Sequence, residues 1–287
     1  MAEIIQRDGT WAFDGDALRL TPGRDRNVSL LRRTLGELVV PLGALAGVSF
    51  EQGKKSGRLR LRLRDGADPL LHASGGRLTE PNDPYQLLVE SDRYGVAEYF
   101  VDEVRGALLL DEVPSEPVTG YLLPGPSVPL SVSAGDGTAS FDGEHVRLEW
   151  NWKTEDAKAA AGTRTLAVTD LLGVEWQPAV GLENGHLRFV VRGAQTKAPA
   201  KYDPHSVELW GFKKDPLMAL VAAAVQARLP HPSAATAEEP PGELPEAPRD
   251  DPDALLRRLR ELGELHRTGV LTDEEFQMTK QAILKRM

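Results

Sequence analysis

Alternation of apolar and polar residues is clearest over Arg58–Arg64, where leucines and arginines take turns along the chain. Because successive side chains of a β-strand point to opposite faces, this period of two predicts a strand with buried leucines and outward arginines. Turn signals such as Asp14-Gly15 and Pro22-Gly23 separate further short β-rich runs. These runs are Thr10–Phe13, Ala17–Thr21, Glu37–Leu42, Gly47–Glu51, Leu70–Ala73 and Tyr85–Glu90. The pattern therefore predicts seven short antiparallel strands in the first third of the chain.

A helical period follows the seventh expected strand and predicts a helix over Val96–Leu110. Its apolar stripe consists of Val96, Phe100, Val101, Val104, Ala107 and Leu108. A second stripe follows Asp215-Pro216, where proline suits a first helical turn. Its members are Leu217, Leu220, Val221, Ala224, Val225 and Leu229. Each stripe predicts an amphipathic helix with one face on a core.

The two halves of this region are similar to each other. Four segments match in order: Asp8–Gly15 with Asp136–Gly143, Leu45–Phe50 with Leu171–Trp176, Gly57–Leu61 with Gly185–Phe189, and Asp83–Tyr85 with Asp203–His205. Their offsets are 128, 126, 128 and 120 residues, and such regular spacing predicts a tandem duplication. We therefore expect a first copy at 1–112, an inter-domain linker at 113–130 and a second copy at 131–230.

Seven short strands closed by one C-terminal helix resemble the pleckstrin-homology-like (PH-like) architecture, in which the helix covers the open end of a bent antiparallel sheet. The expected fold class is mainly β with α, and a plain β-sandwich with a trailing helix is the alternative. The repeat pair, from about Ile5 to Leu229, also resembles DUF4429, an actinomycete family of unknown function placed among bacterial PH-like domains. Hydrophobic patterning and the Asp-Gly and Asp-Pro turns carry this resemblance. It implies two tandem PH-like domains.

Beyond the second copy the pattern changes twice. Residues 231–252 are rich in proline and glutamate and have no apolar face, which predicts a disordered acidic linker. Residues 253–287 regain a helical period, with a capping box at Thr272–Glu275, and predict a helical hairpin. The apolar residues of this hairpin are Leu255, Leu259, Leu262, Leu265, Leu271, Phe276, Ile283 and Leu284.

The hairpin sequence closely resembles the SHOCT (short C-terminal) domain family. The resemblance is carried by the leucine stripe, the turn Gly269–Phe276 and the closing Lys280 and Ile283-Leu284. It suggests oligomerisation or partner docking. A hairpin of about 35 residues also buries too little apolar surface to be comfortably stable alone. We therefore expect its apolar face to pack on a second copy of the chain, an unidentified protein or the chain's own PH-like copies.

Composition excludes several classes of site. The chain has no cysteine, which rules out disulfides, thiolate metal ligands and a cysteine nucleophile, and suits a cytoplasmic location. The N-terminus lacks a secretory pattern, and no run of about 18 apolar residues predicts a membrane span. The net charge of −9 argues against nucleic-acid binding. Neither histidine pairs with metal-ligand spacing nor glycine-rich phosphate motifs occur. We expect a non-enzymatic protein without a metal or cofactor.

The best candidate for a binding surface is the arginine face of the first copy. It comprises Lys54, Lys55, Arg58, Arg60, Arg62 and Arg64. Such a face could bind an anionic lipid headgroup, a phosphorylated peptide or an acidic segment, although a solvated strand face is the simpler interpretation. The second copy has His186, Arg188, Val190 and Arg192 at these positions, so an anion site is expected in the first copy only. The tryptophans of the second copy (Trp150, Trp152, Trp176 and Trp210) are expected in its core or lining a groove.

Two functions stay open at this point. The first is an adaptor or scaffold whose copies bind a protein or an anionic ligand while the hairpin self-associates or docks a partner. The second is a peripheral protein that binds an anionic membrane surface through the arginine face. An enzyme of unknown type is a more distant third alternative.

Overall fold

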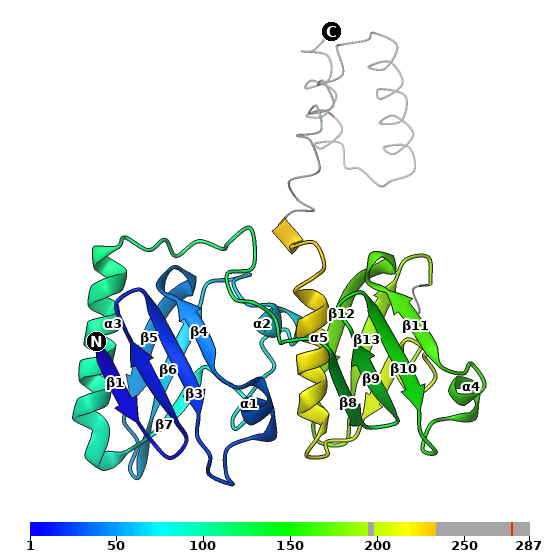
Figure 1. Ribbon diagram of the computed structural model, residues 1–287, viewed down its shortest axis with the longest axis horizontal. Coiled ribbons are helices and arrows are strands. Elements are labelled where there is room, and N and C mark those ends of the chain that lie inside the picture. The colour runs from blue at the N-terminus through cyan, green and yellow to red at the C-terminus, as the bar shows by residue number, and fades with distance from the viewer. Residues whose placement is uncertain (195–197, 234–276, 278–287) are drawn as a thin grey trace. The chain divides into compact units, whose positions relative to one another are not determined.

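The computed structural model describes residues 1–194, 198–233 and 277, and within them the two repeats fold alike (Figure 1). The first copy begins with a four-stranded antiparallel sheet of β1 (Ala2–Ile5), β2 (Gly9–Phe13), β3 (Ala17–Pro22) and β4 (Leu38–Pro41). A three-stranded antiparallel sheet follows, made of β5 (Leu45–Glu51), β6 (Ser56–Leu63) and β7 (Gln86–Glu90). The helices are α1 (Leu30–Leu35), α2 (Pro69–Ala73) and α3 (Tyr94–Leu110), with 3-10 turns η1 (Leu42–Ala44) and η2 (Ser91–Arg93).

The second copy repeats this order. Its four-stranded sheet contains β8 (Leu130–Ala134), β9 (Gly137–Phe141), β10 (His145–Trp150) and β11 (Arg164–Ala167). Its three-stranded sheet contains β12 (Leu171–Gln177), β13 (Gly185–Val191) and β14 (Ser206–Leu209). The helices are α4 (Asp156–Ala159) and α5 (Met218–Gln226), with 3-10 turns η3 (Val168–Asp170) and η4 (Asp215–Leu217). Even the β-bulge in β5, between Leu45 and Gly47, recurs in β12 between Leu171 and Gly173. The tandem duplication and the mainly β fold class are confirmed.

The alternation in β6 follows the prediction. Leu59, Leu61 and Leu63 are buried in the first core, while the arginines between them lie on the opposite face. Hydrophobic burial on one face of the sheet fixes this register, since a slip of one residue would expose every leucine.

One predicted strand is wrong. Residues 70–73 form helix α2, because the Asp68 carboxylate accepts hydrogen bonds from the first free N–H groups of a helix and Pro69 occupies its first turn. The offset between the copies falls from 128 to 120 across this segment, so the first copy is eight residues longer here. The pattern also missed β1, whose residues Ala2 and Ile4 are buried.

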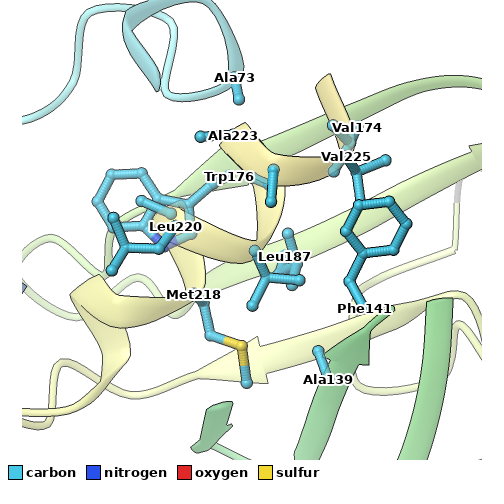
Figure 2. Packing of buried hydrophobic residues seen from close by; sticks show 14 of the residues in the cluster. Ala73, Ala139, Phe141, Val174, Trp176, Leu187, Met218, Leu220, Ala223 and Val225 are labelled. Carbon is cyan, nitrogen blue, oxygen red and sulfur yellow. The ribbon is translucent and has the colours of Figure 1, made fainter. Parts of the chain in front are cut away.

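Helix α5 also departs from the prediction, because all nine of its residues are buried rather than one stripe. A helix that is apolar all round is buried on every side. Here α2 of the first copy packs on the face of α5 that turns away from the strands of the second copy (Figure 1). Figure 2 shows Ala73 of α2 directed at α5, with Trp176 and Leu220 of the second copy in the same cluster. The two copies therefore share this cluster, while the first copy keeps a second hydrophobic core of its own.

The segment expected to be an inter-domain linker is packed on the first copy. Val118 and Leu123 are buried in its core, and their N–H groups donate to the carbonyls of Asp65 and Ala67. The expected acidic linker, from residue 234 on, and nearly all of the expected hairpin lie outside the described residues. The same holds for every proposed oligomerisation residue: Leu255, Leu259, Leu262, Leu265, Leu271, Phe276, Ile283 and Leu284.

Candidate functional site

A cavity of about 1000 Å³ lies on the arginine face of β6. One wall is the outer face of β5 and β6, where Arg60 and Arg62 lie opposite Ser49 and Gly47 in the antiparallel register. The other walls come from α2 and its flanking loops, from Pro117-Val118 of the inter-copy segment, and from residues 231–233 after α5. The strand face that the alternation predicted to be solvated therefore lies in an open cavity, in which Arg60 and Arg64 are half-buried and Arg62 stays exposed.

The structure divides the predicted anion-binding residues into two groups. Arg60, Arg62 and Arg64 line the cavity. Arg58 instead forms an ion pair with Glu80 at 2.7 Å. Lys54 and Lys55 are exposed in the β5–β6 turn, apart from the lining residues. Three of the six residues are thus brought together.

The three lining arginines differ in how their donors are used. Arg64 is fixed, since it donates from Nε to the Glu116 carbonyl (2.8 Å) and from Nη1 to the Gly43 carbonyl (2.9 Å). Arg62 makes one long contact, from Nη2 to the Ala46 carbonyl at 3.4 Å. The Nε of Arg60 is buried and has no hydrogen-bond partner in the described part of the chain. Arg60 and Arg62 therefore retain donors for a ligand.

Acidic residues also line the cavity, but two of them already accept several hydrogen bonds. Asp68 accepts from backbone N–H groups at the start of α2 and from the Tyr85 hydroxyl (2.8 Å). Asp83 accepts from the Tyr85 N–H (2.9 Å) and from the Gln86 amide. Burial raises the pKa of both carboxyls above their ordinary value and raises the pKa of Tyr85. The hydrogen bonds of Asp68 and Asp83 hold the walls in place, and the third lining acid, Asp65, is exposed.

Apolar groups make up much of the remaining surface of the cavity. They come from both sheet and loops and include Val48, Leu71, Tyr85, Pro117, Val118 and Pro232. The cavity therefore combines a guanidinium pair on one strand with apolar walls around it.

A polar network that the sequence did not reveal joins the two copies at the rim of this cavity. The Tyr121 hydroxyl lies 2.7 Å from Nδ1 of His72 and accepts a hydrogen bond from the Gln226 amide (2.9 Å). The Tyr121 ring meets the His231 ring edge to face at 4.8 Å, and Nε2 of His231 lies 3.1 Å from the Gly66 carbonyl. These residues are far apart in the sequence, so no local pattern could have grouped them.

Three histidines, one in the first copy and two in the second, are expected to make the stability depend on pH. Burial lowers the pKa of His72, His186 and His205, and for His72 the nearby His231 acts in the same direction. A histidine with a lowered pKa in the folded state binds protons better when unfolded, so its contribution is complete above about pH 6.5 and is lost as the pH falls. Urea unfolding measured across this pH range gives the free energy of unfolding. This free energy should fall more steeply with decreasing pH for the natural chain than for a His72→Gln, His186→Gln, His205→Gln variant. Identical profiles would contradict the assignment.

The corresponding place in the second copy is filled by the protein itself. Arg188, the counterpart of Arg60, forms an ion pair with Asp203 at 3.1 Å and donates to the Ala198 carbonyl at 2.7 Å. Asp203 is the counterpart of Asp83, and each accepts the N–H two residues ahead at 2.9 Å. Within the described residues, Arg188 thus has a carboxylate at ion-pair distance and Arg60 does not, although the buried Nε of each arginine makes no hydrogen bond there.

A second missed feature is an ion pair in each copy, partly buried in the first copy and fully buried in the second. Asp8 pairs with Arg32 at 2.8 Å in the first copy, and Asp136 pairs with Lys158 at 2.6 Å in the second. Each carboxylate also accepts a backbone N–H from the last strand of its copy, at 3.1 and 2.8 Å. The repeated Asp-Gly-Thr motif was the available signal, although it indicated only a turn. These pairs tie three elements together and are structural.

Neither a metal-ligand cluster nor a membrane-spanning helix is found among the described residues. Among residues 1–194, 198–233 and 277, no three histidine or acidic side chains are grouped as metal ligands. Within the same residues, no helix is both long enough and apolar enough to cross a membrane.

Comparison with known proteins identifies the repeats. The model of the family described as "Domain of unknown function (DUF4429)" matches residues 11–105 and 139–226, which together make up nearly two thirds of the chain. No curated protein sequence matches the chain. The two matches coincide with the two copies seen in the structure, each beginning in or beside the second strand and ending in the closing helix. The chain therefore belongs to the DUF4429 family and contains two tandem copies of its domain.

Proposed function

We propose that this chain is a non-catalytic binding protein, whose first copy holds a small anionic ligand with an apolar body. The observation that carries the proposal is the pair Arg60 and Arg62, which lines a cavity and retains unused donors. A buried guanidinium N–H without a partner costs free energy, and an anionic oxygen would remove that cost.

The shape of each copy supports assigning it to the PH-like class. Four strands and then three strands form two antiparallel sheets, and one helix closes the chain of each copy. In the first copy α3 buries Ala97, Phe100, Val101 and Val104 against the core, as a closing helix does. This support is topological, so it concerns the fold and does not name a ligand.

The size and lining of the cavity suit a small molecule. Ligand pockets commonly enclose roughly 300 to 1,000 Å³ and combine apolar walls with a few polar groups that fix orientation. The arginine pair would bind a carboxylate, sulfonate or phosphate, and the apolar walls would bind the rest of the molecule. The walls formed by α2 and residues 231–233 rise beside β6. They suit a ligand that enters the cavity better than a bilayer that lies flat on this strand.

We also propose that the C-terminal residues provide oligomerisation or partner docking, as the SHOCT resemblance implies. The support is the leucine-rich pattern of residues 253–287, together with the need of so short a hairpin to bury its apolar face.

The anion-binding proposal predicts that charge at Arg60 and Arg62 controls affinity. Anilinonaphthalene sulfonate, an anionic probe with an apolar body, should bind the full chain and gain fluorescence, and octyl phosphate should displace it. An Arg60→Gln, Arg62→Gln variant should bind the probe ~10- to 100-fold more weakly, because charge-assisted hydrogen bonds contribute about 1.5–3 kcal/mol.

The matched control is Arg19→Gln, which removes an exposed arginine of β3 and should leave the affinity unchanged. Octanol is the second control, since it has the same apolar chain without the anion. Equal displacement by octanol and octyl phosphate, or unchanged affinity in the double variant, would contradict an arginine-bound anion.

A further inference from the structure

Two loops at one end of the second copy carry aromatic side chains into solvent. Trp152 is 89% exposed and Phe212 is 57% exposed. They lie in the segments 151–155, after β10, and 210–214, after β14. Trp152 was predicted to lie in a core or line a groove, and its exposure shows that this prediction is wrong. Large exposed rings that gather at one place mark an interaction site more often than single ones do.

The two segments meet around one lysine. Nζ of Lys153 lies 5.4 Å from the Trp152 ring, 5.2 Å from the Trp210 ring and 5.5 Å from the Phe212 ring. The Trp210 and Phe212 rings contact each other edge to face at 6.0 Å. We call the set Trp152, Lys153, Phe212, Lys213 and Lys214 the aromatic–lysine surface; all five residues are exposed.

The second of these segments is held in a fixed shape. One carboxylate oxygen of the buried Asp215 accepts hydrogen bonds from the N–H groups of Trp210 (2.8 Å), Gly211 (2.8 Å) and Phe212 (3.0 Å). Gly211 has a φ of 85°, in the left-handed region that glycine tolerates. The loop is thus built to hold Phe212 outward, and little conformational entropy is lost when the ring is buried by a partner.

A third loop with exposed apolar residues lies next to this surface. The β12–β13 turn carries Val180 and Leu182, which are 66% and 104% exposed. It approaches the second segment closely, since a Cβ built on Gly211 would lie 3.6 Å from the Ala179 Cβ. Apolar tips from three loops therefore lie at the same end of the second copy.

The positive charges of these segments lie beside the exposed rings. Lys153 packs against Trp152, and Lys213 and Lys214 directly follow Phe212, whereas the exposed acids Glu155, Asp156 and Glu183 lie further along the loops. Tryptophan beside lysine is the combination favoured at the membrane–water interface, where the ring enters the headgroup region and the ammonium binds anionic lipid. Protruding apolar tips with basic residues suit insertion into a bilayer better than docking on a flat protein surface.

We propose that the aromatic–lysine surface docks the chain on an anionic membrane, with Trp152 and Phe212 inserted among the headgroups. This site is in the second copy and is separate from the cavity of the first copy. It also differs from the arginine face that the sequence suggested for membrane contact.

The experiment measures co-sedimentation of the full chain with vesicles of phosphatidylcholine alone and of phosphatidylcholine mixed with phosphatidylserine. The natural chain should bind the mixed vesicles. A Trp152→Ala, Phe212→Ala variant should bind ~10-fold or more weakly, since each buried ring contributes substantial apolar area. A Lys213→Gln, Lys214→Gln variant should lose roughly fivefold for each lysine, and added salt should weaken binding of the natural chain.

Matched controls are available in the first copy. Tyr99→Ala removes a ring that is 54% exposed on α3, and Lys54→Gln, Lys55→Gln removes two adjacent exposed lysines. Neither change should alter vesicle binding. The Arg60→Gln, Arg62→Gln variant should also bind vesicles normally, which separates this proposal from that for the cavity.

Two results would overturn the proposal. One is that the natural chain does not bind the mixed vesicles, or that the Trp152→Ala, Phe212→Ala variant binds them equally well. The other is sedimentation equilibrium showing a dimer of the natural chain that dissociates in the Trp152→Ala, Phe212→Ala variant, because the surface would then be covered by a second copy. Circular dichroism of each variant shows whether the fold is retained.

Discussion

Lys158→Ala is expected to lower the free energy of unfolding by about 3–5 kcal/mol, which is the cost of leaving one partner of a buried ion pair uncompensated. Both side chains of the pair are almost completely buried, and the Lys158 ammonium lies 2.6 Å from the Asp136 carboxylate. The ammonium also donates to the Ala200 carbonyl and sits 4.5 Å from the centre of the Trp150 ring. Without Lys158 the Asp136 carboxylate is buried without its counter-ion. Burial already raises the pKa of this carboxyl. Urea unfolding at neutral pH measures the effect.

Lys55→Ala is the control for this prediction, because it removes an exposed lysine and should change stability by no more than about 0.5 kcal/mol. A Lys158→Met, Asp136→Asn variant tests the physical cause. It removes both charges while keeping an acceptor for the Glu208 N–H, so it should recover part of the lost stability. A single Lys158→Ala variant as stable as the natural chain would show that the pair contributes little.

Leu70→Ala in α2 should destabilise the second copy although it lies in the first. Leu70 is 3% exposed and belongs to the same hydrophobic cluster as Val174, Trp176 and the residues of α5. Truncation of a buried leucine to alanine costs about 2–5 kcal/mol, because transfer free energy is lost and a cavity remains. Hydrogen exchange followed by mass spectrometry should therefore show faster exchange in α5 and in β12 and β13.

The control is Leu88→Ala in β7, a leucine of the same copy that is 40% exposed. It should cost little and leave exchange in the second copy unchanged. If Leu70→Ala speeds exchange only within the first copy, the two copies do not unfold as one cooperative unit, and the shared core is energetically unimportant.

The sequence alone determined the duplication, the class of fold and most of the strands. The reason is that these properties depend on local periodicity and on repeated spacing. The leucines of β6 alternate because one face of that strand is buried, and Asp-Gly and Asp-Pro turns recur because each copy bends at the same places. The same logic found α3, whose buried residues follow the predicted stripe.

The sequence misled where a long-range contact decided the environment. Residues 70–73 were predicted as a strand because of their apolar run. A cap at Asp68 makes them helical, and Leu70 and Ala73 are buried with α5. Trp152 was predicted to lie in the core because tryptophan is a large apolar residue, but its loop exposes it to solvent. Local propensity is a weak guide when tertiary packing supplies the larger free energy.

The candidate sites divide in the same way. The alternation in β6 is sufficient by itself to place Arg60, Arg62 and Arg64 on one strand face. Only the tertiary structure showed that this face forms one wall of an open cavity, because the other walls come from α2, the inter-copy segment and residues beyond α5, up to about 170 positions away. A cavity forms from surfaces that meet in space, and the pattern of one segment carries no information about which distant segment will cover it.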